Sequence, residues 1–485
     1  MLKSCRNITS GQEFPPEKTD RRNPMPETLK RPFGARDKFG YLFGDFGNDF
    51  TFILSTTILM KFYTDVMGVP AAIVGAIMMI ARFVDAFTDV TMGRICDKSK
   101  GNAAGKFKPW ILRMCGPVAV ASFLMYQSGL AGMSMGLKIG YLFVTYILWG
   151  SVFYTSINIP YGSMASAVSA DPGDRQSLST YRTMGGMLAG AVIGILVPLV
   201  AYKKVDGQET LVGSRVTVIA AVFSLLAIGC YLLCYFLTTE RVRPRQTQQQ
   251  THSTMTMLKN AVKNRSLISI IAASVVMLLA QLTMQGMAGY IYPEYYNSAG
   301  AQSASTIVMM AAMGISAAFA KPLAAKFGKA EVSVVSNFFA AGVCVLTFLW
   351  RPENVWVFVA LQGLNWLGLG IFSMVSWALI TDVIDDSEIR TGVREDGSVY
   401  ALYSFARKLG QAASAGLSGA LLSLIGYSDQ TKTDPAVLDG VFNISTLVPA
   451  IGFAALALIL WLWYPLHKKK VDANVAALAE KHREQ

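Results

Sequence analysis

The chain has 485 residues, of which 53% are hydrophobic and only 15% are charged, and its mean hydropathy is +0.40. Soluble domains usually carry about 25% charged residues, so this composition excludes a disordered chain, a collagen, a disulfide scaffold and an ordinary cytosolic enzyme. The net charge of +12 comes from basic clusters between hydrophobic runs. That is the positive-inside pattern of a membrane protein rather than a nucleic-acid surface. We therefore expect an all-α membrane protein whose surroundings are the lipid bilayer.

The first 38 residues are polar and contain no apolar segment typical of a cleavable signal peptide. After them, runs long enough to supply the roughly 20 residues that cross a hydrocarbon core follow one another. We predict twelve membrane-spanning helices at 39–63, 68–93, 109–132, 138–168, 180–202, 215–238, 266–290, 304–326, 331–350, 354–382, 398–426 and 441–466.

The longest internal polar segment, 239–264, follows the sixth predicted helix and leaves six more behind it. This division predicts two six-helix bundles with a linker between them and a polar tail at each end. The predicted boundaries are 1–38 (tail), 39–238 (bundle), 239–264 (linker), 265–467 (bundle) and 468–485 (tail). Because Lys and Arg gather in the tails, the linker and the loop 94–108, we expect both termini to be cytoplasmic in a multi-pass plasma (inner) membrane protein.

The cysteines and histidines indicate no metal site. The cysteines form no CxxC pair, and most lie in apolar runs where Cys behaves as a small hydrophobe. The histidines His252, His467 and His482 all lie in hydrophilic stretches. We expect no zinc site, no histidine relay within the membrane and no cofactor.

Charged side chains in the first two predicted helices are functional candidates, because charges are costly in lipid. Asp45 and Asp49 are four residues apart and share one face of the first helix. For Asp45, which lies close to the helix end, a structural role is an open alternative.

The second helix carries Arg82, Asp85 and Asp89 in one polar stripe, with Thr88 beside it. Two carboxylates and an alcohol are hard oxygen ligands that suit a small alkali cation or a proton. The alternative is an Arg82–Asp85 salt bridge that only positions helices.

Two later helices carry polar groups that could bind a sugar. The fourth has Tyr154, Thr155, Asn158 and Tyr161, and rings with hydroxyls and amides suit sugar faces and hydroxyls, although packing explains such rings too. The eleventh has Arg407 and Lys408 in succession, about 100° apart on the helix, so both cannot face one pocket. The seventh and tenth helices carry further polar and aromatic residues, for which interhelical hydrogen bonds or packing are explanations at least as good as sugar binding: Gln281, Gln285, Gln362, Asn365, Trp366 and Trp377.

Four stretches resemble the glycoside–pentoside–hexuronide:cation symporter family of the major facilitator superfamily. They are GDFGNDF at 44–50, the motifs between 61 and 112, YTSINIPYGS at 154–163 and the segment 381–412. The resemblance extends from Lys38 to Tyr464. It implies a major facilitator fold and secondary active transport, in which a sugar and a monovalent cation cross together by alternating access.

The resemblance also implies roles for single residues. It implies a sugar site formed by Asp49, Tyr154, Asn158, Arg182 and Lys408. It implies a cation site for Na⁺ or H⁺ formed by Asp85, Asp89, Thr155 and Thr88, in which the two carboxylates would be the metal ligands for sodium.

Two departures from the melibiose-type pattern bear on substrate and ion. Asn158 stands where those members have an aspartate, and Thr88 stands where they have an asparagine. The other motifs are more similar to the glucuronide and pentoside branches, and a less acidic cavity suits an anionic sugar. We therefore predict a β-glucuronide, another hexuronide or a pentoside as substrate, with a neutral galactoside or glucoside taken up with Na⁺ as the alternative.

The basic loop Gly93–Trp110 is predicted to act as a gate between the bundles, with Asp97 and Lys106 as salt-bridge partners and Arg394 as a further gating residue. The acidic cluster at 382–388 could instead hold Mg²⁺ in a membrane enzyme. We do not expect an enzyme, because Arg390 and Arg394 follow the cluster and can pair with it. A transporter-like sensor without turnover is not distinguished by the sequence.

Overall fold

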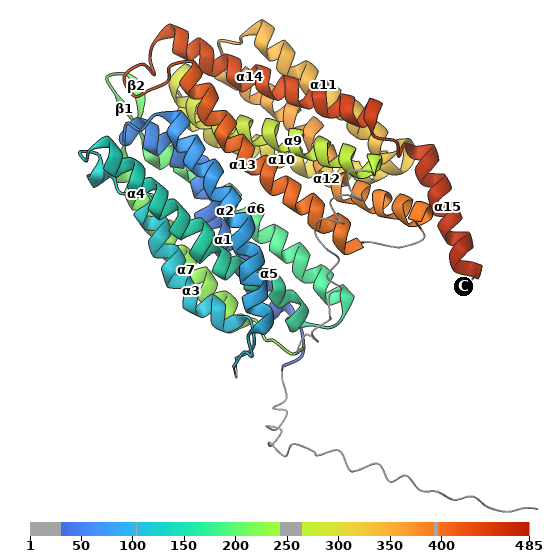
Figure 1. Cartoon of the computed structure of the whole chain (residues 1–485). Coiled ribbons are helices and arrows are strands. Elements are labelled where there is room, and N and C mark those ends of the chain that lie inside the picture. Colours follow the sequence, from blue (N-terminus) through green and yellow to red (C-terminus); the bar gives the residue numbers. More distant parts are fainter. Residues whose placement is uncertain (1–30, 103, 243–263, 392–395, 485) are drawn as a thin grey trace, which may run out of the picture. The chain divides into compact units, whose positions relative to one another are not determined.

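The structure is a computed structural model that describes residues 31–102, 104–242, 264–391 and 396–484. Its first half consists of helices that run back and forth (Figure 1). They are α1 (Ala35–Leu54) with π-helical turns at Ser55–Leu59 and Phe62–Val66, α2 (Ala71–Lys98), α3 (Lys108–Leu124), a 3₁₀ turn (Ser128–Leu130), α4 (Met135–Ile147) continued through a π-helical segment (Leu148–Tyr154) into α5 (Thr155–Val168), α6 (Pro172–Ala201) and α7 (Gly213–Leu237).

The second half has the same character, and its helices appear in yellow to red in Figure 1. They are α9 (Arg265–Tyr290) with a π-helical turn at Ile291–Tyr295, α10 (Ala299–Phe327), α11 (Lys329–Trp350), α12 (Val355–Thr391), α13 (Asp396–Leu424), α14 (Pro435–Leu458) with a π-helical turn at Ile459–Trp463, and α15 (Lys468–Glu484).

Each predicted membrane-spanning segment coincides with one of these helices or one continuous pair. Within the described ranges, nine helices are long and apolar enough to cross a membrane. The other three predicted spans correspond to α1 and α13, which carry charged residues, and to α3, which has 17 residues. The largest shift is in α12, which continues to Thr391 beyond the predicted end at 382, because its last turns are polar and hydropathy does not detect them.

Two elements were not predicted. A hairpin joins α6 to α7, with β1 (Tyr202–Val205) antiparallel to β2 (Gln208–Leu211). Its turn residues Asp206 and Gly207 both have positive φ, of 49° and 81°, as a two-residue Asp-Gly hairpin turn requires. The second element is α15, which packs against α12 through Asn474, whose amide donates to Asp386 at 3.2 Å.

Polar caps set where several helices begin. The Asp171 carboxylate accepts from the backbone N–H of Asp174 at 2.9 Å and caps α6, whose first residue is Pro172. The side chain of Asn264 caps α9 in the same way, through the N–H of Leu267. At α3, the Glu240 carboxylate from beyond α7 accepts from three backbone N–H groups, those of Lys106, Phe107 and Lys108, at 2.7–2.9 Å. These caps satisfy amides that have no partner within the helix.

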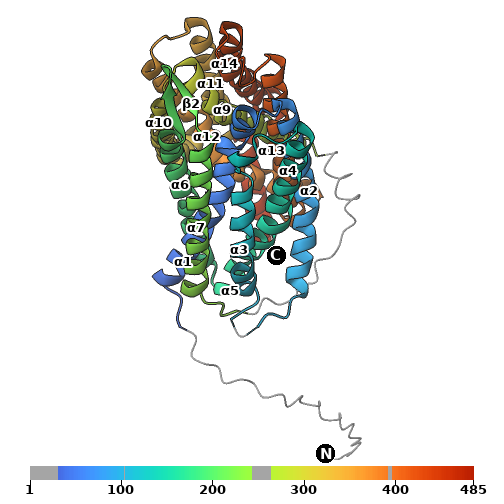
Figure 2. The same ribbon diagram turned by 90° about the vertical axis from the view of Figure 1, so that its left-hand side faces the viewer.

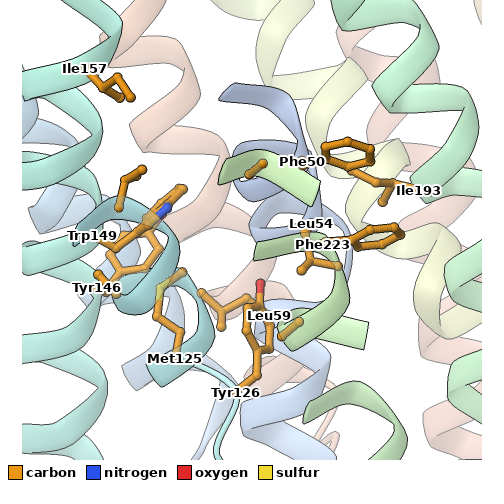
Figure 3. Packing of buried hydrophobic residues seen from close by; sticks show 14 of the residues in the cluster. Phe50, Leu54, Leu59, Met125, Tyr126, Tyr146, Trp149, Ile157, Ile193 and Phe223 are labelled. Atoms are coloured by element: carbon orange, nitrogen blue, oxygen red, sulfur yellow. The ribbon is translucent and has the colours of Figure 1, made fainter. Parts of the chain in front are cut away.

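Each half has its own hydrophobic core. In the first half, Phe50 of α1 stacks on Phe223 of α7, and Trp149 lies beside Tyr146 in the α4–α5 helix (Figure 3). A second cluster lies within α9–α14. A third contains Ala71 of α2 together with residues of α9, α12, α13 and α14, and therefore joins the halves.

The halves meet most closely where small residues face each other. We call the end that carries β1–β2 the hairpin end, and the opposite end, where α1 begins and α7 ends, the linker end (Figure 2). Near the hairpin end, α2 crosses α13 so tightly that a Cβ on Gly419 would lie 2.5 Å from the carbonyl oxygen of Ala71. On the other pair, α6 and α10, Thr306 donates to the carbonyl of Gly194 at 3.1 Å. Glycine therefore permits backbone contact between the halves.

We predict that Gly419→Ala destabilises the protein by about 1–3 kcal/mol, because the added methyl overpacks the α2–α13 crossing. Thermal unfolding of the purified protein, followed by tryptophan fluorescence, measures the effect. Gly229→Ala in α7 is the matched control, since a Cβ there meets no atom within 4 Å, and it should be neutral or stabilising by up to about 1 kcal/mol. Equal effects of the two substitutions would contradict the tight crossing.

Candidate functional site

The polar stripe on α2 faces the α4–α5 helix. Arg82 Nη1 lies 3.3 Å from Asp85 Oδ2, and the Ser151 hydroxyl donates to Asp85 Oδ1. The Arg82 guanidinium also lies over the ring of Phe52, 4.8 Å from its centroid. Ser151 was not predicted, although it precedes Thr155 by one helical turn. The stripe therefore draws its second set of oxygens from a neighbouring helix.

Asp89 joins the two halves of the molecule. Thr155 donates to Asp89 Oδ1 at 2.9 Å, and the Lys408 ammonium of α13 contacts Asp89 Oδ2. The other hydrogen bonds and ion pairs between described residues of opposite halves lie near the hairpin end. Lys408 thus occupies a ligand position of the predicted cation site.

The two carboxylates of the predicted cation site both have basic side chains as ion-pair partners. Asp85 and Asp89 are each paired with one basic side chain, so the pair of carboxylates is balanced. Thr88 donates to the backbone carbonyl of Asp85 at 3.1 Å. Among described residues there is no group of three or more His, Cys, Asp and Glu side chains that could hold a metal. The role of Asp85, Asp89, Thr155 and Thr88 in binding a proton or a monovalent cation stays a prediction.

A second acidic pair lies on α1. Arg182 Nε of α6 donates to Asp45 Oδ1 at 3.0 Å, and its guanidinium lies 5.3 Å from the ring centroid of Tyr161. A Cβ on Gly186 would lie 2.6 Å from Asp49 Oδ2 and 3.1 Å from Asp45 Oδ2. Glycine at this position therefore lets both carboxylates approach α6, where Arg182 pairs with Asp45.

Tyr154 and Asn158 lie in the same half. The ring of Tyr154 stacks on Phe52 with centroids 5.7 Å apart. Asn158 accepts from the amide of Asn48 at 3.3 Å, and Asn48 accepts from the Tyr231 hydroxyl at 2.8 Å. Asn158 is therefore part of a hydrogen-bond chain that links α5, α1 and α7.

A cavity of about 350 Å³ lies between the halves. The described residues that line it include two basic side chains, Lys61 and Arg82, and no carboxylate. Hydroxyls, amides and rings make up much of the remaining wall: Thr56, Thr57, Tyr146, Gln285, Tyr290, Gln302, Ser305, Thr306, Gln362, Trp366, Gln411, Ser414, Ser418 and Ser445. A cavity of this size and chemistry can hold a small polyhydroxylated ligand.

The predicted sugar residues do not form this wall. Of them, Asp49, Tyr154, Asn158 and Arg182 lie within the first half, and Lys408 pairs with Asp89. Their role in sugar binding stays a prediction. Of the residues that the sequence left open, three line the cavity (Gln285, Gln362 and Trp366) and three do not (Gln281, Asn365 and Trp377). Gln411 was missed, although it lies three residues after Lys408 on the same face of α13.

A buried charged cluster at the hairpin end was also missed. Lys61 is 2% exposed, lies 2.8 Å from Asp65 and pairs with Glu294 of the second half. Tyr427, at the end of α13, accepts from Lys61 at 2.9 Å and donates to Asp65 at 3.1 Å. The i, i+4 spacing of Lys61 and Asp65 was the available signal. Pairing with Glu294 could not be read from the sequence.

Two of the predicted gating residues contact each other, but through a backbone carbonyl rather than a salt bridge. Lys106 Nζ donates to the backbone carbonyl of Asp97 at 3.2 Å, within the first half. Arg394 lies outside the described residues, whereas Arg390 pairs with Asp386 at 2.7 Å, as expected for the acidic cluster. Arg407 lies 5.8 Å from the ring centroids of Trp377 and Tyr403, so it points away from the Lys408–Asp89 contact. A gating role for Asp97, Lys106 and Arg394 stays a prediction.

Comparison with known proteins gives consistent matches. Residues 40–468 match the family described as MFS/sugar transport protein. The chain is 29% identical to the glucuronide carrier protein homolog of Escherichia coli (strain K12), over 94% of this chain and 98% of that one. It is 30% identical to the isoprimeverose transporter of Lactiplantibacillus pentosus, over 93% and 92%. The crystal structure of the D-xylose-proton symporter superposes with a TM-score of 0.59 at 13% identity, covering 89% of this chain and 96% of that one. The crystal structure of the nucleoside transporter NupG superposes with a TM-score of 0.62 at 14% identity, covering 89% of this chain and 99% of that one.

We predict that Asp89 and Lys408 are energetically coupled. Lys408→Gln should destabilise the protein by about 1–3 kcal/mol, because it leaves the Asp89 carboxylate without its basic partner, and adding Asp89→Asn should recover most of that loss. A double-mutant cycle on unfolding free energies measures the coupling. The Arg351–Asp439 pair, at 2.9 Å and with side chains that are 38% and 58% exposed, is the control and should couple by less than about 1 kcal/mol. Strictly additive effects at Asp89 and Lys408 would contradict the pairing.

Proposed function

We propose that this chain takes up an anionic glycoside together with a monovalent cation. The proposal starts from the family to which the chain belongs, the MFS/sugar transport protein family. Membership makes it a membrane sugar transporter with the major facilitator fold. The family expected from the four motifs is thereby confirmed. The Mg²⁺ enzyme is set aside, because the matched relatives and solved structures are transporters.

The observation that carries the proposal is the contact between Asp89 and Lys408. Without a coupling cation, Lys408 neutralises Asp89 and ties α13 to α2. When Na⁺ or H⁺ binds at Asp85 and Asp89, the carboxylate no longer needs the ammonium, and the tie is released. The cation therefore binds more tightly to the arrangement in which Lys408 has left Asp89. A ligand shifts a conformational equilibrium only through such a difference in affinity between the two states.

The driving force follows from the charge that moves. A membrane potential of 100 mV contributes about 2.3 kcal/mol per elementary charge. One cation per sugar therefore supports roughly fiftyfold accumulation of a neutral sugar by the potential alone. With a monoanionic sugar, the net charge per cycle is zero at one cation, so the ion gradient itself or a second cation must supply the energy.

The cluster of Lys61, Asp65, Glu294 and Tyr427 supports alternating access. It joins the halves at the hairpin end. With both termini in the cytoplasm, that end faces the outside. The structure then corresponds to a state closed to the outside. To admit the substrate from that side, the contacts of Lys61 and Asp65 with Glu294 and Tyr427 must break.

The substrate class is supported by the charge of the cavity wall and by the relatives. The described residues that line the cavity include Arg82, whose one ion-pair partner is Asp85, and no carboxylate. When the coupling cation neutralises Asp85, the Arg82 guanidinium favours an acidic sugar by electrostatic complementarity. One relative is named as a glucuronide carrier and others as putative sulfoquinovose importers. A hexuronide is therefore our first proposal, followed by a pentoside, as the name of the isoprimeverose transporter relative suggests.

Uptake into proteoliposomes tests this function. We expect a radiolabelled β-glucuronide to accumulate under either an imposed Na⁺ gradient or an imposed proton gradient, and to do so more than a xyloside or a galactoside. Accumulation should disappear in Asp85→Asn, which removes a cation ligand. Gradient-independent exchange that is unchanged in Asp85→Asn would mean that the α2 stripe is structural. Accumulation of a neutral galactoside with Na⁺ instead would favour the alternative substrate.

We predict that Tyr427→Phe makes the hairpin end open more often. The substitution removes a hydroxyl that bonds Lys61 and Asp65, and each such bond stabilises the closed state by about 1 kcal/mol. A cysteine at Thr56, which lines the cavity, should then react about three to ten times faster with an impermeant maleimide added outside intact cells. Tyr295→Phe, at the same end but with no described hydroxyl bond, is the control and should change nothing. Unchanged labelling in Tyr427→Phe would rule out this role.

A further inference from the structure

Arg82 belongs both to the polar stripe and to the cavity. It pairs with Asp85 and also lines the cavity. Its described ion pair is a single Nη1–Oδ2 contact at 3.3 Å, and both side chains are 14% exposed. A guanidinium has five N–H donors, so most of its hydrogen-bonding capacity is left. Arg82 can therefore turn from Asp85 toward a ligand without leaving its place on α2.

The other basic residue of the wall is already balanced. Lys61 has two carboxylates, Asp65 and Glu294, and the Tyr427 hydroxyl as partners. Arg82 has one carboxylate, Asp85, and Asp85 is also one of the proposed cation ligands. Cation binding at Asp85 therefore leaves Arg82 as the positive group of the cavity whose charge is not compensated.

The cavity wall also contains polar side-chain groups for which no hydrogen-bond partner is described. The Gln302 side-chain oxygen is buried and makes no hydrogen bond to the described residues. No described hydrogen bond uses the side chains of Gln285 and Gln411, which also line the cavity. Buried polar groups are normally satisfied. A ligand rich in hydroxyls would satisfy these.

One ring completes the wall. Trp366 of α12 is 6% exposed and lines the cavity, one turn from Gln362. An indole face packs well against the apolar face of a pyranose, while amides beside it take the hydroxyls. The second half therefore offers contacts to the sugar ring, and the first half offers a guanidinium to an acidic group.

We propose that Arg82 is the residue that binds the acidic group of the substrate, with Trp366, Gln285, Gln362 and Gln411 holding its sugar ring. This assignment rests on the proposed hexuronide transport and names a specificity residue for it. A cation on Asp85 releases Arg82, and Arg82 then binds the substrate carboxylate in the bidentate geometry that a guanidinium favours. The linkage is reciprocal: a carboxylate that draws Arg82 away from Asp85 raises the cation affinity by the same factor.

A matched pair of ligands tests the assignment. Methyl β-D-glucuronide and methyl β-D-glucoside differ only in a carboxylate against a hydroxymethyl group. Titration calorimetry on the purified full chain, with and without Na⁺ and at two pH values, measures both affinities. We expect the native protein to prefer the glucuronide and to bind it more tightly with the coupling cation. Arg82→Gln should lower the preference by at least about tenfold, the loss of one hydrogen-bonded charge pair, while glucoside binding stays.

Two further variants make the result independent of folding. Arg82→Gln leaves Asp85 without its basic partner, so the double variant Arg82→Gln/Asp85→Asn removes both charges and should show the same loss of preference. In Asp85→Asn alone, Arg82 is free at all times, and glucuronide binding should no longer depend on the cation. Arg113→Gln is the control, an exposed arginine of α3 with no described ion pair, and it should bind as the native protein does.

The outcomes separate this assignment from the function on which it rests. Native protein that binds neither sugar, or both equally, overturns the hexuronide proposal and this assignment with it. Native preference for the glucuronide that survives in Arg82→Gln and in the double variant overturns the assignment alone. Loss of the preference in Arg182→Gln, with the preference intact in both Arg82 variants, would place the acidic group at the α1–α6 pair instead.

Discussion

A carboxylate within a membrane-spanning helix is stable only beside a positive charge or a proton, and this constraint organises the interior of the protein. Four carboxylates of the first two membrane-spanning segments have a basic partner: Asp45 with Arg182, Asp65 with Lys61, Asp85 with Arg82, and Asp89 with Lys408. Asp49, one turn after Asp45 on α1, has no described ion pair and lies against α6 at Gly186. Three of the partners come from the same half. The fourth, Lys408, comes from the other half, and so charge neutralisation also fixes how the halves meet.

Because neutrality is shared between the halves, any cation that neutralises Asp89 competes with Lys408. The same competition acts one turn earlier, where a cation on Asp85 competes with Arg82, which faces the cavity. In the proposed mechanism, ion binding is linked both to the arrangement of the halves and to the charge offered to the substrate. Both links follow from one stripe on one helix.

The sequence was sufficient for the helices and the stripe and insufficient for the partners. Hydropathy located the membrane-spanning helices, because a run of about 20 apolar residues matches the thickness of the hydrocarbon core. Spacing placed Asp85 and Asp89 on one face. Lys408 lies 319 positions from Asp89, and no local pattern encodes such a contact. The β1–β2 hairpin was readable from its Asp206–Gly207 turn. The extension of α12 was not, because polar helical turns resemble a loop in hydropathy.

If the coupling cation replaces Lys408 on Asp89, cation-induced infrared difference spectroscopy of the purified protein should detect the change at the Asp89 carboxylate. If Na⁺ is the coupling ion, its addition should shift the carboxylate stretching bands. If H⁺ is the coupling ion, acidification should instead produce the carbonyl band of a protonated carboxyl group. We expect these bands to be lost in Asp89→Asn, and to appear at lower cation concentration in Lys408→Gln because the competitor is gone. Bands that persist in Asp89→Asn, or a cation requirement unchanged in Lys408→Gln, would contradict the account.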